Sequence, residues 1–154
     1  MIVFEEFRVK TPEREVLLEI TNEIRKIVRN SSINEGVCRV FVPHTTAGIT
    51  INENADPSVM KDISNYLNKL IPKGGSLGYS FKHMEGNSDA HIKCSLTGHS
   101  LELLIHEGRL MLGLFLFFLS YLIQDFKVSK MKKEIISQPK TGQGFVAAST
   151  LGGV

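Results

Sequence analysis

The sequence predicts an α+β fold: a largely antiparallel β-sandwich or meander with two amphipathic helices, at about 12–30 and 57–70. Apolar side chains recur at helical spacing in those two segments. Elsewhere, short alternating or β-branched runs are bounded by glycine and proline, which is typical of strands. With 154 residues, of which 42% are hydrophobic and 22% charged, the chain has the size and composition of one globular domain.

The first strand and the first helix are predicted close to the N-terminus. Residues 2–9 alternate loosely between apolar and polar side chains, which favours a strand. Thr11 and Pro12 are typical of an N-cap and a first helical residue, so the helix is expected to begin there. The apolar stripe that follows extends this helix to about residue 30.

Two strands and the second helix follow. The β-branched run 37–42 predicts a strand, and residues 45–51 predict the next one. Asp56 and Pro57 again form a cap followed by a proline. Apolar residues then recur at helical spacing, so this second helix is expected at 57–70.

The next part of the chain is predicted to be a strand meander. Residues 89–96 alternate strictly, which predicts a strand with His91 and Lys93 on its polar face. A turn at 97–100 and a return strand at 101–105 complete the expected hairpin. A further turn and a third strand follow from residue 110 onward.

Charge and composition divide the chain into a domain and a tail. Residues 127–154 contain five lysines and one glutamate, whereas the formal charge of the whole chain is only +2. We therefore expect a single domain at 1–126 and an atypical basic tail at 127–154, partly disordered. A near-neutral domain lacks the clustered basic face that nucleic acid requires, so nucleic acid is not an expected partner.

Cysteine usage and the apolar runs predict a cytoplasmic protein. Cys38 and Cys94 lie in strand-like runs without metal or redox spacing, so both are expected to be small buried hydrophobes in a reducing compartment. The N-terminus has no basic-then-apolar leader. The apolar run 110–123 is shorter than the ~20 residues of a membrane helix and is expected to form a buried strand or core helix. No membrane partner is expected.

Three histidines are candidate metal ligands. The stretch 83–91 contains His83 and His91 together with two carboxylates and a carboxamide, and His44 follows a predicted strand. Three imidazoles with an oxygen ligand suit zinc or another divalent transition-metal ion. The alternative, in which they are ordinary hydrogen-bonded surface side chains, stays open at this point.

Oxygen and cationic side chains near these histidines suggest a phosphate site. Glu53 at a strand end, or Asp89, can ligate a metal or act as a general base. Hydroxyls beside a glycine suit phosphate oxygens, although threonine is equally ordinary at a strand start. The candidate anion-binding residues are Thr45, Thr46, Lys93 and Arg109.

Several of these segments resemble the YjbQ family, whose members are often named secondary thiamine-phosphate synthase enzymes. The resemblance is carried by residues 41–57, 85–91, 107–110 and 112–113, and covers about residues 1–113. Members are small cytoplasmic α+β proteins, β-sandwich in character, and homotrimers. The resemblance implies that the three histidines gather around a metal or anion. It also places four further side chains near them: Asn52, Glu53, Asn87 and Asp89.

The resemblance stops after Gly113. The family pattern continues with a Thr-Trp-Gln-Gly turn and an acidic ending, whereas this chain continues with 114–119, Leu-Phe-Leu-Phe-Phe-Leu, and contains no tryptophan. We interpret the change as divergence or as a shifted reading frame. The family ending would supply a last strand and polar groups for the site, so its loss bears on trimer packing and activity.

The resemblance implies a thiamine-phosphate synthase-like transferase, which joins a pyrimidine diphosphate to a thiazole phosphate and releases diphosphate. The alternative is a metal- or phosphate-binding protein without significant turnover. The expected cofactor is a divalent metal, either zinc at the three histidines or magnesium carried with diphosphate, and the expected partner is a small phosphorylated substrate. The expected roles are catalytic for Glu53, Asp89 and Asn87, substrate-binding for Thr45, Thr46, Asn52, Lys93 and Arg109, and metal-binding for His44, His83 and His91.

Overall fold

The computed structural model describes residues 2–113, 116–123 and 129–136, which form two antiparallel sheets, a short hairpin and three helices. The larger sheet has the order β1 (Ile2–Val9), β10 (Ser129–Ile136), β3 (Gly36–Phe41), β7 (Ser100–His106), β8 (Arg109–Leu110). The smaller sheet has the order β2 (Glu15–Glu19), β9 (Leu116–Ile123), β4 (Ala47–Glu53). The predicted α+β class is confirmed.

The hydrophobic core lies between the two sheets and is closed by the first helix, α1 (Thr21–Asn30). Cys38 and Val40 of β3 pack in one cluster with Ile49 of β4 and with Ile24 of α1. All four side chains are fully buried. A core that contains side chains from both sheets is what a sandwich requires.

The first helix begins later than predicted. Residues 15–19 form β2, which pairs with β9, and α1 starts only at Thr21. The predicted start at Thr11 and Pro12 is therefore wrong, because the pairing with a distant strand outweighs the local helix signal. The Glu19 carboxylate accepts a hydrogen bond from the Thr21 backbone N–H at 2.9 Å and so satisfies one of the free donors at the helix start.

The second helix, α2 (Pro57–Leu70), has the predicted bounds. The Asp56 carboxylate accepts a hydrogen bond from the Ser58 backbone N–H at 2.8 Å, and Pro57 occupies the first turn, where its missing N–H costs nothing. The loop that follows contains the short hairpin of β5 (Gly75–Ser76) and β6 (Tyr79–Ser80).

The predicted strand at 89–96 is wrong, because these residues form a third helix, α3 (Ser88–Thr97). Its buried positions are Asp89, Ala90, Lys93 and Cys94, which share one helical face. Two of these four residues are charged, so the sequence shows no apolar stripe along this buried face. The strict alternation of apolar and polar residues is incidental. The expected hairpin partner, β7, pairs instead with β3 and β8.

The C-terminal strands complete both sheets. Residues 116–123 of the apolar run form β9, which lies between β2 and β4, so of the two expected structures, a buried strand or a core helix, this part forms a strand. The predicted basic tail contributes β10 to the interior of the larger sheet, between β1 and β3. The rest of that tail, 137–154, lies outside the described residues. None of the helices in the described ranges has the length and hydropathy that crossing a bilayer requires.

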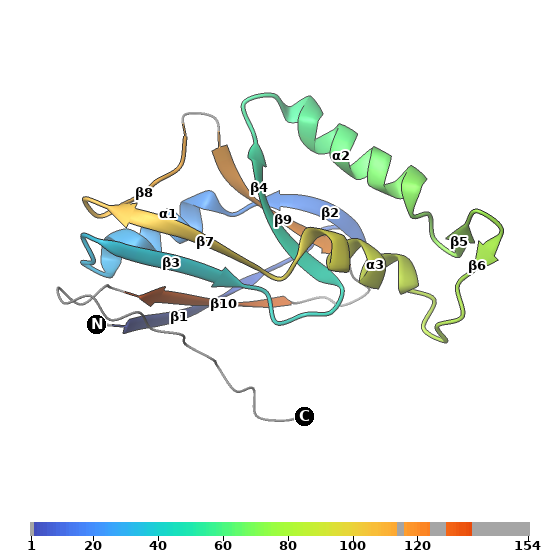
Figure 1. Cartoon of the computed structure of the whole chain (residues 1–154), viewed down its shortest axis with the longest axis horizontal. Coiled ribbons are helices and arrows are strands. Elements are labelled where there is room, and N and C mark those ends of the chain that lie inside the picture. The colour runs from blue at the N-terminus through green and yellow to red at the C-terminus, as the bar shows by residue number, and fades with distance from the viewer. Residues whose placement is uncertain (1, 114–115, 124–128, 137–154) are drawn as a thin grey trace.

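Figure 1 shows how this arrangement positions the candidate site residues. The helix α3 crosses near the first residues of β4, while α1 and β8 lie at the opposite end of the molecule. The helix α2 runs along the outside, above the smaller sheet. The histidines at the start of α3 and the arginine of β8 therefore lie at different ends.

Candidate functional site at the start of helix α3

His83 and His91 form a stacked pair. Their ring centroids lie 5.3 Å apart and the ring planes differ by 27°. His91 lies in the first turns of α3, and His83 lies in the preceding loop, which turns at Gly86 with φ +68°. The Gly86 backbone N–H donates to the His83 carbonyl oxygen at 3.0 Å, so the turn itself directs the chain back toward the helix.

His44 approaches this pair from the segment between β3 and β4. Burial lowers the pKa of His44 from its ordinary value of 6.5, and the positive charge of His91 lowers it further. The Cys94 thiol, which donates to the Ala47 carbonyl oxygen at 3.0 Å, holds this segment against α3. His44 is therefore a neutral imidazole at neutral pH, the form that ligates metals.

His83 and His91 are in contact, and His44 lies close enough to His91 for its charge to act on it, but the three rings are not arranged around a common ion. Among the residues with described positions, no group of three or more His, Cys, Asp or Glu side chains is placed to hold a metal. The Glu85 backbone N–H lies 3.3 Å from Nδ1 of His83 and donates to it. An ion bound at Nδ1 would replace this hydrogen bond. Otherwise, the exposed ring of His83 would have to rotate to present its other nitrogen.

Asp89 is held by an arginine rather than turned toward the histidines. Its side chain is only 1% exposed, and both carboxylate oxygens accept hydrogen bonds from the Arg14 guanidinium at 3.0–3.1 Å. Asp89 also lies in the first turn of α3, where the helix dipole favours a negative charge. Its position indicates a structural role.

Lys93 is also engaged inside the protein. Its side chain is fully buried, and its ammonium group donates to the Glu15 carboxylate and to the Asn68 side-chain oxygen. These contacts join α3 to β2 and to α2. An ammonium group enclosed in this way does not face a substrate phosphate.

Asn52 and Glu53 lie at the far end of β4 from His44. Both end the seven-residue strand, whereas His44 precedes it. At about 3.3 Å per residue, the two ends of this strand are roughly 20 Å apart. Arg109 is also distant, because β8 pairs with the end of β7 that lies away from α3. Within one chain, these three residues do not reach the histidines.

Three other predicted site residues do lie beside the histidines. Thr45 is exposed, and the hydroxyl of the buried Thr46 is 3.3 Å from Nδ1 of His44. Asn87 precedes α3 and donates from its side-chain amide to the Glu85 carboxylate at 3.1 Å. Its carbonyl oxygen Oδ1 is buried and has no hydrogen-bond partner among the described residues. Such an acceptor is available to a ligand or a water molecule.

Sequence reasoning missed the partners that fix α3, namely Arg14, Glu15 and Asn68. The only available signal was the four-residue spacing of Asp89 and Lys93, which on a helix places both on one face. That spacing would have revealed a charged buried face only if 89–97 had been predicted as a helix.

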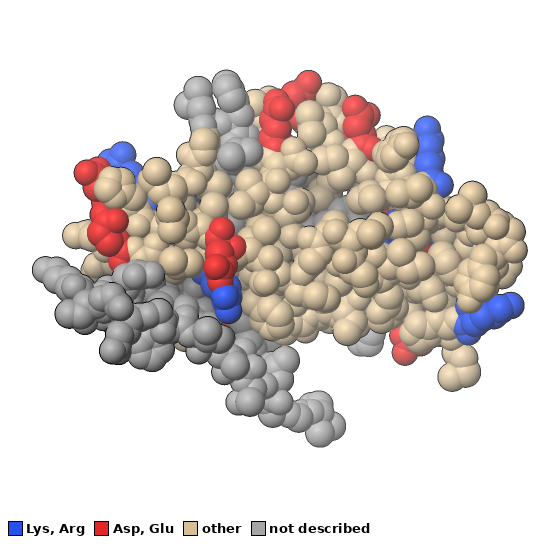
Figure 2. Space-filling view, viewed as in Figure 1, with Lys and Arg blue, Asp and Glu red and all other residues tan. Residues whose placement is uncertain are grey.

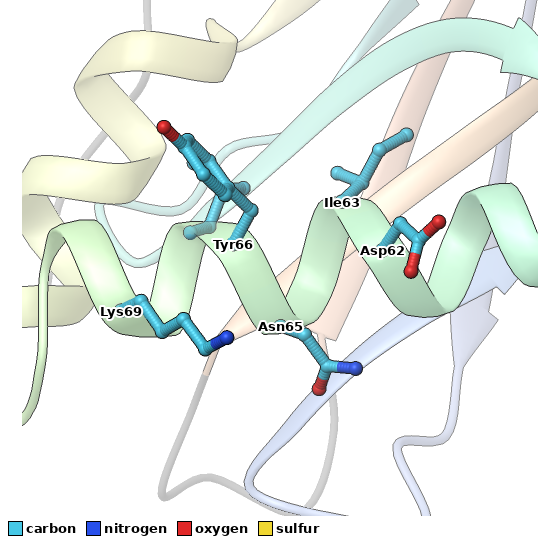
Figure 3. A pocket seen from close by; sticks show the side chains of 6 residues that line it. Asp62, Ile63, Asn65, Tyr66 and Lys69 are labelled. Atoms are coloured by element: carbon cyan, nitrogen blue, oxygen red, sulfur yellow. The ribbon is translucent and has the colours of Figure 1, made fainter.

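A shallow hollow of about 590 Å³ lies along α2 and contains none of the predicted site residues. Figure 3 shows Tyr66 and Ile63 on one side of the helix and Asn65 on the other. The hollow lacks a convergent group of ionisable side chains. On the face shown in Figure 2, the Lys and Arg side chains lie scattered toward the edges and form no continuous basic patch.

Comparison with known proteins agrees with this architecture. Residues 5–116 match the family model described as UPF0047 protein YjbQ-like. The chain belongs to the YjbQ family. UPF0047 protein MJ1081 of Methanocaldococcus jannaschii is 51% identical over 107 residues, which cover 70% of this chain and 75% of that protein. UPF0047 protein YugU of Bacillus subtilis is 42% identical over 106 residues, covering 69% of this chain and 78% of that protein.

Solved structures of YjbQ relatives share the fold. A YjbQ/UPF0047 protein from Clostridium acetobutylicum is 43% identical, with a TM-score of 0.80 over 86% of this chain and 99% of that one. A YbjQ-like protein of unknown function from Sulfolobus solfataricus is 26% identical, with a TM-score of 0.82 over 90% of this chain and 99% of that one. The likeness in fold thus extends beyond residue 116, where the sequence match ends.

Proposed function

We propose that this YjbQ-family protein binds a divalent transition-metal ion through His44, His83 and His91, and thereby holds a small phosphorylated molecule. The observation that supports this most directly is the stacking of the His83 and His91 rings at 5.3 Å, with His44, from a separate segment, within reach of the charge of His91. Imidazole nitrogens are ordinary zinc ligands, and three of them leave a fourth position for an exchangeable ligand.

The side chains around the histidines suit a phosphate ligand. The exposed Thr45 hydroxyl lies beside His44 and can donate to a phosphate oxygen. The Asn87 carbonyl oxygen can accept from a protonated ligand atom or a water molecule. A bound divalent ion would supply Lewis acidity toward the phosphate oxygens. Because these groups are few and surround a small site, a small molecule is the expected partner rather than nucleic acid.

Metal titration of the full chain tests this proposal. Substituting His91→Ala or His83→Ala removes one of three imidazole ligands, so we expect zinc affinity, measured by chelator competition, to fall at least about 100-fold. His106→Ala is the matched control, because His106 lies at the β7–β8 end and pairs with Glu35 at 3.0 Å. Zinc affinity that is unchanged in both His91 and His83 variants would refute the site.

The pH dependence of zinc binding provides a further check on the same protein. Metal binding competes with protons for the imidazole nitrogens, so affinity falls as the solution becomes acidic. Because the pKa of His44 lies below the ordinary value of 6.5, protonation of this ring competes only at lower pH than for an ordinary histidine. We therefore expect His44→Ala to weaken the proton competition at pH values below the ordinary histidine range, which a pH series of the chelator competition measures.

The transferase that the YjbQ resemblance implies is the second candidate. It would use the proposed ion and the Thr45 and Thr46 hydroxyls to stabilise the diphosphate that leaves the pyrimidine methylene carbon. Glu53 and Asn52 would have to come from another copy, because within one chain they lie a strand's length from His44. This candidate therefore requires the homotrimer that the resemblance implies.

A complementation assay distinguishes the transferase from a binding protein. If His91 and Glu53 act from different copies, thiamine phosphate formation is expected to be lost in His91→Ala and in Glu53→Gln. It should be partly restored when the two variants are mixed, unfolded and refolded together. If the wild-type protein binds metal but forms no thiamine phosphate, the binding function is supported and the transferase is excluded.

A further inference from the structure

A second pocket lies at the opposite end of the molecule from the histidines, between α1 and the β7–β8 turn. Its volume is about 510 Å³, within the range of small-molecule sites. The polar residues that line it are three arginines and one asparagine, namely Arg25, Arg29, Arg109 and Asn22. Val28 and Leu110 supply the apolar part of the lining.

The helix α1 presents its polar pocket residues together. Asn22, Arg25 and Arg29 are three and then four residues apart, so they lie on one face of the helix. Val28 beside them is 1% exposed and anchors the helix in the core. The guanidinium groups of this face are therefore carried by a rigid element.

The hairpin turn positions the third arginine. Gly108 has φ +72°, and its backbone N–H donates to the Asn34 carbonyl oxygen at 3.0 Å, which fixes the turn against the segment after α1. The Glu35 carboxylate accepts from the Glu107 backbone N–H at 3.1 Å and pairs with His106 at 3.0 Å. The turn is thus held from two directions just before Arg109.

The charge of this pocket is not balanced by its own lining. No Asp or Glu side chain lines it. Within the described residues, neither Arg29 nor Arg109 has a carboxylate within ion-pair distance, and the nearby Glu35 carboxylate is already used by the turn. Arginines that line one pocket repel one another, and a bound anion lowers that repulsion.

We infer that this pocket binds a small anion that carries a phosphate or diphosphate group. Arginine is the side chain best suited to such groups, because its planar fork donates two parallel hydrogen bonds to phosphate oxygens. This assignment gives Arg109 a role separate from the histidine site. The anion pocket and the proposed metal site depend on different residues, so one proposal can be refuted while the other stands.

Calorimetric titration of the full chain with sodium diphosphate tests the inference, after metal has been removed with a chelator and the chelator has been dialysed away. Removing one guanidinium by Arg29→Gln or Arg109→Gln is expected to weaken diphosphate binding at least about ten-fold each. Lys26→Gln removes the same charge from an exposed position of α1 outside the pocket and is expected to change the affinity less than about two-fold.

The outcomes separate a built pocket from general charge attraction. Loss of binding in Arg29→Gln and Arg109→Gln, with Lys26→Gln unaffected, supports the pocket. Equal weakening in Lys26→Gln, or no binding of diphosphate by the wild-type chain at low millimolar concentration, overturns it. Arg29 is exposed, so its variant is expected to fold and decides the matter even if Arg109→Gln does not fold.

Discussion

Replacing Arg14 with methionine is expected to lower the free energy of unfolding by about 3 kcal/mol. Arg14 donates to both oxygens of Asp89, whose side chain is 1% exposed. Without the guanidinium, the Asp89 carboxylate remains buried and loses its ion pair, and breaking a buried ion pair by removing one partner is one of the most costly changes in a protein interior. The dipole at the start of α3 offsets a part of that cost. Urea denaturation measures the loss.

The double variant Arg14→Met/Asp89→Asn identifies the cause of this destabilisation. It removes the unpaired charge together with its partner, so we expect it to be more stable than Arg14→Met alone. Lys26→Met, on the exposed face of α1, is expected to change stability by less than about 0.5 kcal/mol. An Arg14→Met protein as stable as the wild type would show that the ion pair does not hold α3 in place.

Gly48→Ala is expected to destabilise the protein by about 2–3 kcal/mol, because the site has no space for a side chain. A Cβ atom on this residue of β4 would lie 1.9 Å from the Thr97 hydroxyl oxygen and 3.0 Å from the Gly98 carbonyl oxygen. The strand and the end of α3 are in such close contact that the Ile49 backbone N–H donates to the same carbonyl oxygen at 3.0 Å. Relief requires α3 to move, which thermal unfolding will detect.

Thr97→Ala provides the matched background for Gly48→Ala. It removes the nearest atom but leaves the Thr97 Cβ position and the Gly98 carbonyl oxygen, so Gly48→Ala should cost less in this background without becoming neutral. A shift of α3 also moves His91 relative to His44, so zinc affinity should fall with stability. If Gly48→Ala causes no loss of stability either in the wild type or in the Thr97→Ala variant, the close contact between β4 and α3 is contradicted.

The elements that the sequence predicted well are those with local chemical signals. Asp56 and Pro57 predict the start of α2, β-branched residues predict β3, and an apolar run too short for a membrane helix indicates β9. The helix α3 was missed because two of its buried residues are charged and depend on Arg14 and Glu15, which are more than 70 positions away in sequence. Such long-range ion pairs leave no trace in local periodicity.

The candidate site was predictable only in part, for a similar reason. The density of polar groups around His83 and His91 indicated a site, and the two rings do stack. Proximity in sequence suggested that Glu53 joins His44, but β4 is extended and separates them by its full length. Lys93 was expected to face a substrate, and only the tertiary structure reveals its buried contacts with Glu15 and Asn68.

The C-terminal part illustrates how tertiary pairing overrides composition. The lysine-rich segment after residue 127 is typical of a solvated tail, yet β10 pairs with β1 and β3 along both edges. In that register Lys132 pairs with Glu6 of β1, and Lys133 with Glu5, so acidic residues of the first strand oppose basic residues of β10. The same register places Arg8 opposite Lys130, a like-charge pair that disfavours it, whereas the two pairs of opposite charge favour it.

The proposed metal site is tested most directly by anomalous X-ray scattering from zinc-loaded crystals of the full chain. One zinc peak is expected about 2.0–2.1 Å from a ring nitrogen of each of His44, His83 and His91. A zinc-loaded structure in which these ring nitrogens lie more than about 8 Å apart, or in which the three rings enclose no zinc peak, would contradict it, since bonds of about 2 Å cannot bridge that separation.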